Sequence, residues 1–259
     1  MTRYAAMFER LGKRDEGALG AFVMLGDPDL ATSAAMLDAL VEGGADMVEV
    51  GIPFSDPVAD GPVIQAAAVR ALAAGTRTAD CLRLLAEFRD RHRQVPVGIL
   101  TYANLVVARG REAFYRAVAE AGVDSVLVAD VPLIEAGPFL AAARSAGVAP
   151  VLIAAPNTPP ERLARIAAAG EGYTYCVARA GVTGADSQVH FPADVIAALV
   201  EAGAPPPVLG FGISEPGHVR LALRAGAAGV ISGSAIVDRI DRGEDIRPFV
   251  RLLKVATRP

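Results

Sequence analysis

Hydrophobic and polar positions recur in one order along this chain: an amphipathic stretch, a glycine, and a short apolar run. Copies of this unit cover 41–50, 119–128, 144–153, 167–176, 200–209 and 223–232. A glycine directly after a helix supplies the left-handed conformation that ends the helix. An apolar run of four or five residues rich in Val, Ile and Leu is typical of a parallel strand buried on both faces. The pattern therefore predicts repeated helix–strand units.

The units are spaced by about 30 residues, the length of one βα unit. We expect strands over 19–25, 46–50, 96–101, 124–129, 149–153, 172–177, 207–210 and 228–232. The helices expected between them include 31–43, 79–91, 112–121, 135–146, 160–169, 192–202 and 216–225. Tyr4, Phe8 and Leu11 have helical spacing and predict a short helix before the first strand.

Eight strands alternating with helices favour an α/β fold, the (β/α)8 TIM barrel, with an extra N-terminal helix and short extra helices in the βα loops. An open, doubly wound parallel sheet is the alternative. It is disfavoured because GDPDL follows the first strand, where a dinucleotide-binding fold has GxGxxG. No linker-like segment divides the chain, so we expect residues 1–259 to form a single TIM-barrel domain.

Composition narrows the class of protein further. With 53% hydrophobic residues the chain has ample material for a core, and its net charge of −4 offers no basic field for nucleic acid or an anionic membrane. No apolar run reaches the ~18 residues of a membrane span, and no secretory signal is recognisable. The two cysteines and three histidines are scattered, so neither a disulfide scaffold nor a metal site is expected. These features favour a cytoplasmic protein.

The segment 49–65, EVGIPFSDPVADGPVIQ, is the strongest candidate for chemistry. Functional groups of a TIM barrel collect at the carboxyl ends of its strands. Glu49 ends a predicted buried strand, where a carboxylate is costly unless it is paired or functional. Asp60 follows eleven residues later and can face Glu49 across a bound substrate. The alternative is that Glu49 caps the barrel through a salt bridge and the aspartates only make turns.

Two glycine-containing segments follow the last two predicted strands: GFGIS at 210–214 and SGSAIV at 232–237. Barrels frequently bind phosphate at this position, through backbone N–H groups and the N-terminus of a short helix. Gly212, Gly233 and Ser234 are the candidate residues, with ordinary turns as the alternative. The loop 180–186 contains two glycines and can serve either as a lid or as a plain connection.

The segment 49–65 closely resembles the signature of the tryptophan synthase alpha chain family. Other segments resemble that family in the same order: FVMLGDP, TYANLV, DSVLVADVP, GYTYCVARAGVTGA, GFGIS and AGAAGVISGSAIV. The resemblance spans essentially residues 1–256 and implies a lyase that splits indole-3-glycerol phosphate into indole and glyceraldehyde 3-phosphate. It implies no cofactor in this chain, and a pyridoxal phosphate-dependent beta chain as partner in an α2β2 heterotetramer. Asp56 and Asn104 match positions near that contact.

The resemblance also assigns roles to individual residues. Glu49 is expected to protonate the indole ring at C3, and Asp60 to hold the indole N–H. For that role Glu49 needs a raised pKa, which its apolar setting would provide. The residues expected to line the indole slot are Phe22, Leu100, Tyr102, Leu127, Ala129 and Ile153, some of which could equally be barrel core. Tyr175 is expected near the glycerol end, Thr183 against Asp60, and the phosphate at Gly184, Gly212, Gly233 and Ser234.

Two departures from the family pattern concern substrate fit and loop kinetics. Met24 stands where a smaller polar residue is expected, and the stretch 186–192 differs from the expected one. Three other functions remain open at this point: a sugar-phosphate isomerase or epimerase, a non-catalytic barrel that binds a partner, and a free-standing indole-releasing lyase.

Overall fold

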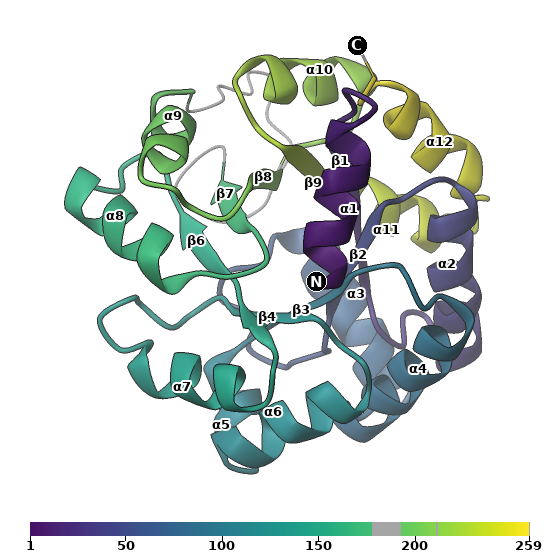
Figure 1. The fold of residues 1–259 in the computed structure, drawn as a ribbon. Helices are drawn as coiled ribbons and strands as arrows, with labels where there is room; N and C mark the ends of the chain where they lie inside the picture. The colour runs from purple at the N-terminus through teal and green to yellow at the C-terminus, as the bar shows by residue number, and fades with distance from the viewer. Residues whose placement is uncertain (178–192, 211, 259) are drawn as a thin grey trace.

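The computed structural model describes residues 1–177, 193–210 and 212–258. Helices and strands alternate along the chain (Figure 1). The strands are β1 (Ala18–Met24), β2 (Met47–Gly51), β3 (Val97–Thr101), β4 (Ser125–Val128), β5 (Ala149–Pro150), β6 (Leu152–Ala154), β7 (Thr174–Val177), β8 (Pro207–Gly210) and β9 (Gly229–Ser232). The helices are α1 (Arg3–Gly12), α2 (Leu30–Glu42), α3 (Pro62–Ala73), α4 (Thr78–Arg91), α5 (Ala103–Val107), α6 (Arg111–Glu120), α7 (Gly137–Ser145), α8 (Pro160–Ala169), α9 (Ala193–Glu201), α10 (Pro216–Arg224), α11 (Ser234–Asp241) and α12 (Arg247–Val255).

The described strands form one parallel sheet in the order β5-β4-β3-β2-β1-β9-β8-β7-β6. Its two ends, β5 and β6, are consecutive parts of one stretch of chain interrupted at Val151. The first part pairs with β4 and the second with β7, and Val151 N–H donates to the Val126 carbonyl at 3.1 Å. The sheet therefore closes on itself, which confirms the predicted TIM barrel.

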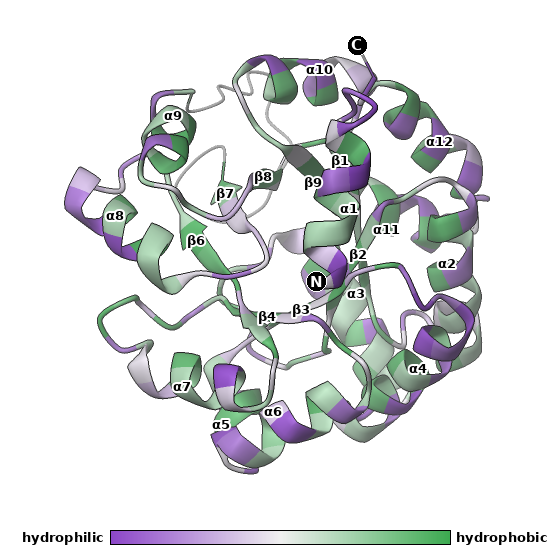
Figure 2. Ribbon diagram, in the orientation of Figure 1, coloured by the Kyte–Doolittle hydropathy of each residue, from purple (hydrophilic) through white to green (hydrophobic). Residues whose placement is uncertain are grey.

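Side chains along the strands alternate between two buried clusters. Val23, Val50 and Ile99 belong to the cluster between the strands and the outer helices. Phe22, Met47 and Leu127 belong to a second cluster, inside the barrel. Strands buried on both faces need the nearly continuous apolar runs seen in the sequence. The outer helices carry apolar and polar residues together (Figure 2), as expected of helices with one buried stripe.

The helix α1 lies across the amino-terminal end of the barrel, in front of the strands in Figure 1. Tyr4, Met7 and Leu11 are buried on it, whereas Phe8, which the spacing placed with Tyr4 and Leu11, is only partly buried. The Thr2 side chain accepts a hydrogen bond from the Ala5 N–H at 3.2 Å and caps the helix. Thus α1 plugs one end of the barrel and leaves the other end for the site.

The loops after β2, β3 and β9 contain the extra helices α3, α5 and α11, which confirms that part of the expected architecture. Four helices lie outside the predicted ranges: α3, α5, α11 and α12. The alanine-rich sequence of α3 has little helical periodicity, and α12 follows the last repeat.

Left-handed backbone occurs at Gly44 (φ 101°) and Gly226 (φ 94°), as predicted. In the copy at 167–176 the prediction was wrong, because Gly170 has φ −80° and the left-handed residue is Gly172 (φ 77°). No helix within the described ranges has both the length and the apolar character needed to cross a bilayer.

Candidate active site

Glu49 lies inside the barrel on β2 and is only 2% exposed. It pairs in register with Phe22 on β1 and Gly98 on β3. The Tyr173 hydroxyl donates a hydrogen bond to Oε1 of Glu49 at 2.6 Å. Its other oxygen, Oε2, is buried and has no hydrogen-bond partner among the described residues. Because Glu49 forms no ion pair with any residue that the structure describes, the geometry does not favour the interpretation that Glu49 caps the barrel through a salt bridge.

Burial raises the pKa of Glu49 to about 7, because the surrounding apolar groups disfavour its charged form. The charge of Asp60 raises the pKa further, and the hydrogen bond from Tyr173 opposes both effects. The shift has the direction expected from the sequence. A carboxyl group with a pKa near neutrality can both give and take a proton at physiological pH.

Tyr173 is supported from the plugged end of the barrel. Its ring lies 5.4 Å from that of Tyr4, measured between centroids, and the Tyr4 hydroxyl is 2.8 Å from Oγ of Ser125. A side chain at Gly98 would collide with this group, since an added Cβ would lie 2.8 Å from Ser125 Oγ and 3.0 Å from Tyr4 Oη. The sequence interpretation missed the contact of Tyr173 with Glu49. The available signal was alternation: Tyr173 is two residues from Tyr175 within the predicted strand 172–177, and both side chains belong to the interior cluster.

Asp60 ends the loop between β2 and α3 and is 7% exposed. Burial raises its pKa to about 6, while a hydrogen bond with the Tyr102 hydroxyl lowers it. That hydroxyl also accepts a hydrogen bond from the Ala59 N–H at 3.3 Å. The Tyr102 ring stacks on Phe54, with centroids 5.5 Å apart. Tyr102 therefore fixes the loop that carries Asp60, a contact that the sequence did not indicate. Asp56, in contrast, is exposed.

The remaining slot candidates lie in the interior of the barrel. Those in or packed against the interior cluster are Phe22, Leu100, Leu127, Ala129, Ile153 and Tyr175. Tyr175 lies over Gly210, where an added Cβ would be 2.0 Å from the tyrosine Oη. Gly210 is thus required for the close approach of this ring, a role that the GFGIS pattern alone could not reveal.

The phosphate candidates lie on two loops that the fold joins. Oγ of Ser232 donates to the Ile213 carbonyl at 2.7 Å, and Gly212 has left-handed backbone (φ 78°). Gly233 is the N-cap of α11 and Ser234 its first residue, so backbone N–H groups at this helix start are free of helical partners. An added Cβ on Gly233 would lie 3.4 Å from Cβ of Phe22. The helix start is therefore next to the slot.

Thr183 and Gly184, with the whole predicted lid 180–186, lie outside the described residues. Within the described ranges, no group of three or more His, Cys, Asp and Glu side chains is arranged to hold a metal ion. The site described above consists of two buried carboxylic acids, an apolar slot and glycine-rich helix starts.

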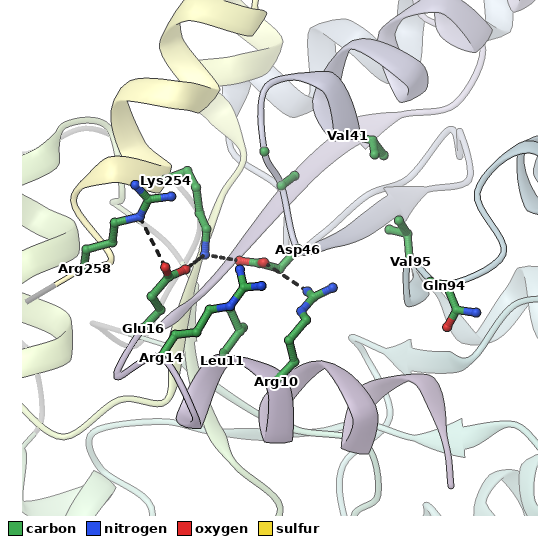
Figure 3. Close-up of a pocket in the computed structure, with 12 residues that line it drawn as sticks. Arg10, Leu11, Arg14, Glu16, Val41, Asp46, Gln94, Val95, Lys254 and Arg258 are labelled. Atoms are coloured by element: carbon green, nitrogen blue, oxygen red, sulfur yellow. Dashed lines mark hydrogen bonds and ion pairs between the residues drawn. The ribbon is translucent and has the colours of Figure 1, made fainter.

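A different pocket, of about 280 Å³, opens at the amino-terminal end of the barrel (Figure 3). There Lys254 points between two carboxylates, 2.8 Å from Asp46 and 3.1 Å from Glu16. Arg10 adds a longer contact with Asp46 and Arg258 one with Glu16. These ion pairs join α1, the strand starts and α12, so we assign the group a structural role and call it the basal clamp.

Comparisons with known proteins give matches over nearly the whole chain. The family model described as tryptophan synthase alpha chain matches residues 8–257. The tryptophan synthase alpha chain of Shewanella amazonensis is 53% identical over 266 residues, covering 99% of this chain and 100% of the relative. That of Cronobacter sakazakii is 52% identical over 268 residues, covering 100% of both. Among solved structures, tryptophan synthase from Mycobacterium tuberculosis matches with a TM-score of 0.91 at 31% identity, covering 100% of this chain and 99% of that one.

Proposed function

Because the chain belongs to the tryptophan synthase alpha chain family, we propose that Glu49 and Asp60 carry its reaction. This alpha chain is a lyase that cleaves indole-3-glycerol phosphate and partners a beta chain, and pyridoxal phosphate belongs to the beta chain. The observation that carries the assignment is Glu49 itself: buried, with a pKa of about 7 and with Oε2 unpaired among the described residues.

The chemistry requires an acid, a charge stabiliser and a base. Protonation at C3 of the indole removes the aromaticity of the pyrrole ring and leaves positive charge on its nitrogen. The bond from C3 to the glycerol side chain then breaks, and its electrons return to the ring as a base removes the adjacent hydroxyl proton. Protonated Glu49 is suited to the first step and its carboxylate to the last. Asp60, when ionised, is suited to hold the N–H while the ring is positive.

The surrounding groups support this assignment. The apolar interior around Phe22, Leu100 and Leu127 fits a planar aromatic ring and keeps water from the two carboxyl groups. The start of α11 at Gly233 and Ser234 offers backbone N–H groups and the positive end of a helix to a phosphate dianion. Gly212 supplies a second close backbone approach.

We further propose that the beta chain docks on the loops at the carboxyl ends of β2, β3 and β4, in an α2β2 assembly. Three aliphatic side chains are exposed there: Val58 at 70%, Val107 at 42% and Ile134 at 77%. Asp56 and Asn104 are exposed on two of the same loops. Apolar groups gathered next to a site are typical of a protein contact. Indole released inside the barrel would leave toward this face. We propose that residues 1–259 act as a single barrel domain, in the cytoplasm.

The test is Glu49→Gln, assayed for indole release from indole-3-glycerol phosphate with and without an added beta chain. Glutamine keeps the size and hydrogen-bonding capacity of Glu49 but cannot shuttle a proton. We expect folded protein with kcat reduced by about 10²- to 10⁴-fold. Retained cleavage would remove Glu49 from the mechanism.

Asp60→Asn tests the charge stabiliser in the same assay. We expect kcat to fall by about 10²- to 10³-fold, because a neutral amide cannot offset the positive charge on the ring. Unchanged turnover by this variant would exclude charge stabilisation by Asp60. Strong stimulation of the wild-type chain by the beta chain would identify a subunit, and a high rate without it would identify a free-standing lyase.

A further inference from the structure

The inner faces of β1 and β2 fit together by pairing methionine with glycine. In register, Gly20 is opposite Met47, Phe22 is opposite Glu49, and Met24 is opposite Gly51. An added Cβ on Gly20 would lie 2.8 Å from Cε of Met47, and one on Gly51 would lie 2.8 Å from Cε of Met24. Above the Glu49 layer the Met24 thioether therefore fills the place of a missing side chain, whereas below it Met47 shares the place at Gly20 with Ile231, whose Cγ1 would lie 2.6 Å from the added Cβ.

Met24, the methionine nearer the carboxyl end of the barrel, borders the space above Glu49. Gly51 follows Glu49 by two residues, so it is on the same face of β2 but nearer the carboxyl end. On its other side Gly51 pairs with Leu100 on β3. An added Cβ on Gly51 would lie 3.0 Å from Sδ of Met24 and 3.0 Å from Cζ of Phe22. The gap at Gly51 is thus bordered by Phe22 and filled by the end of Met24.

This position matters because of where a substrate ring must lie. For the carboxyl group of Glu49 to reach a ring carbon, the ring has to occupy the space next to that carboxyl on the open side of the barrel. Met24 is 4% exposed and shares the interior cluster with Ile64 of α3. Any substituent on the side of the ring that faces β1 and β2 would therefore meet the thioether first.

Methionine differs from the other wall residues in its freedom to move. It is unbranched, has three rotatable side-chain bonds and a polarizable sulfur that packs favourably on aromatic rings. Leu100 and Phe22 have fewer rotamers and cannot retract in the same way. We propose that Met24 is a specificity-determining residue, whose thioether sets the width of the slot above Glu49 and gives way to small substituents on the benzo ring. This inference rests on the proposed cleavage of indole-3-glycerol phosphate.

The experiment compares kcat/KM for indole-3-glycerol phosphate with that for its 4-, 5-, 6- and 7-methyl derivatives, using the chain together with its beta chain. We expect Met24→Ala to raise the ratio of methylated to unmethylated substrate by about tenfold for at least one derivative, the effect of one methyl group in an apolar pocket. Met24→Leu keeps the volume but not the flexibility, and the same ratio should fall below that of the wild type.

Met47→Ala is the matched control, because it removes the same side chain from the other side of the Glu49 layer. Its substrate ratios should equal those of the wild type even if its stability falls. Gly51→Ala should lower kcat/KM for every substrate, and the double variant Met24→Ala/Gly51→Ala should recover much of that loss, because the new methyl group then has room.

Equal substrate ratios in the Met24 and Met47 variants would overturn the inference while leaving the proposed function intact. Absence of cleavage of the unmethylated substrate by the wild-type chain would overturn the proposed function, and the inference with it.

Discussion

At the amino-terminal end of the barrel, buried Asp46 and partly buried Glu16 lie beside Lys254, which contacts both carboxylates. At the carboxyl-terminal end, Glu49 and Asp60 are both buried, but no described cation pairs with either of them. The hydrogen bond from Lys254 lowers the pKa of Glu16 below its ordinary value, whereas burial raises that of Glu49 to about 7. The Glu16 carboxylate is therefore favoured in its charged form, whereas Glu49 is close to its titration point at neutral pH.

This difference shows what distinguishes a structural carboxylate from a candidate catalytic one within the same fold. Burial by itself disfavours the charged form, and a cation within reach reverses the effect. The basal clamp supplies cations from α1 and α12. Among the residues that the structure describes, the active-site end supplies tyrosine hydroxyl groups, which can hold a carboxyl group in place without fixing its charge. Proton transfer is possible only where the charge is free to change.

We expect the largest change in stability when Lys254, the cation that Asp46 and Glu16 share in the basal clamp, is removed. Lys254→Met leaves buried Asp46 with a hydrogen bond from the Leu19 N–H and the longer contact of Arg10, and partly buried Glu16 with the longer contact of Arg258. We expect the free energy of unfolding to fall by about 3–5 kcal/mol, because an uncompensated charge remains in the interior. Denaturant unfolding measures this loss. Lys13→Met is the control: its pair with Glu9 is exposed, and the change should stay within about 0.5 kcal/mol. Equal losses in both variants would contradict a structural role for the clamp.

The two ends of the barrel should also differ in how their carboxyl groups change the stability of the protein with pH. The folded pKa of Glu49, about 7, exceeds its model-compound value of 4.5, so the native state binds this proton more tightly than the unfolded state. Its contribution to stability is full below pH 4.5 and is lost as pH rises through 7. Glu49→Gln should therefore gain stability relative to the wild type over that range, by about 3 kcal/mol.

Glu16→Gln should change in the opposite direction. Its folded pKa is lowered, so its contribution is present above the unfolded pKa and is lost as the solution is acidified. This variant should be less stable than the wild type at pH 7 and approach it in acid. Unfolding curves of both variants between pH 4 and 8 provide the measurement. Parallel pH profiles would mean that the two glutamates do not differ in charge state.

The smallest effect concerns the hydroxyl group that Tyr102 offers to Asp60. Tyr102→Phe removes a hydrogen bond that lowers the Asp60 pKa, so this pKa should rise above 6 and less Asp60 should be ionised near neutrality. We expect kcat/KM to fall by about tenfold at pH 6.5 and by less at pH 8.5, as judged from the rate of indole release. Tyr115→Phe, a buried tyrosine on α6, should show no such pH-dependent loss. A uniform loss across pH would indicate damage to the loop alone.

The sequence alone predicted the barrel, which the structure confirms, and it named the candidate residues for the chemistry. Apolar runs recurring at the length of a βα unit leave few other ways to bury both faces of a parallel sheet. Glu49 could be singled out because a carboxylate at the end of a buried strand is costly without a purpose, and Asp60 because it follows in the next loop and can face Glu49. The predicted strands and helices lie within a few residues of the observed ones. The helices α3, α5, α11 and α12 had no predicted range, because alanine-rich, short or terminal segments fall outside the repeat.

Only the tertiary structure decided which groups surround these acids. Tyr173 is 124 residues from Glu49 along the chain, and Tyr102 is 43 residues from Ala59, separations over which no local pattern carries information. The pKa of Glu49 depends on how many apolar atoms replace water around it and on which hydroxyl group reaches it. Met24 and Gly51 likewise became partners only through the register of β1 and β2. Periodicity specifies which face of an element is buried, but contacts between elements are set by packing in three dimensions.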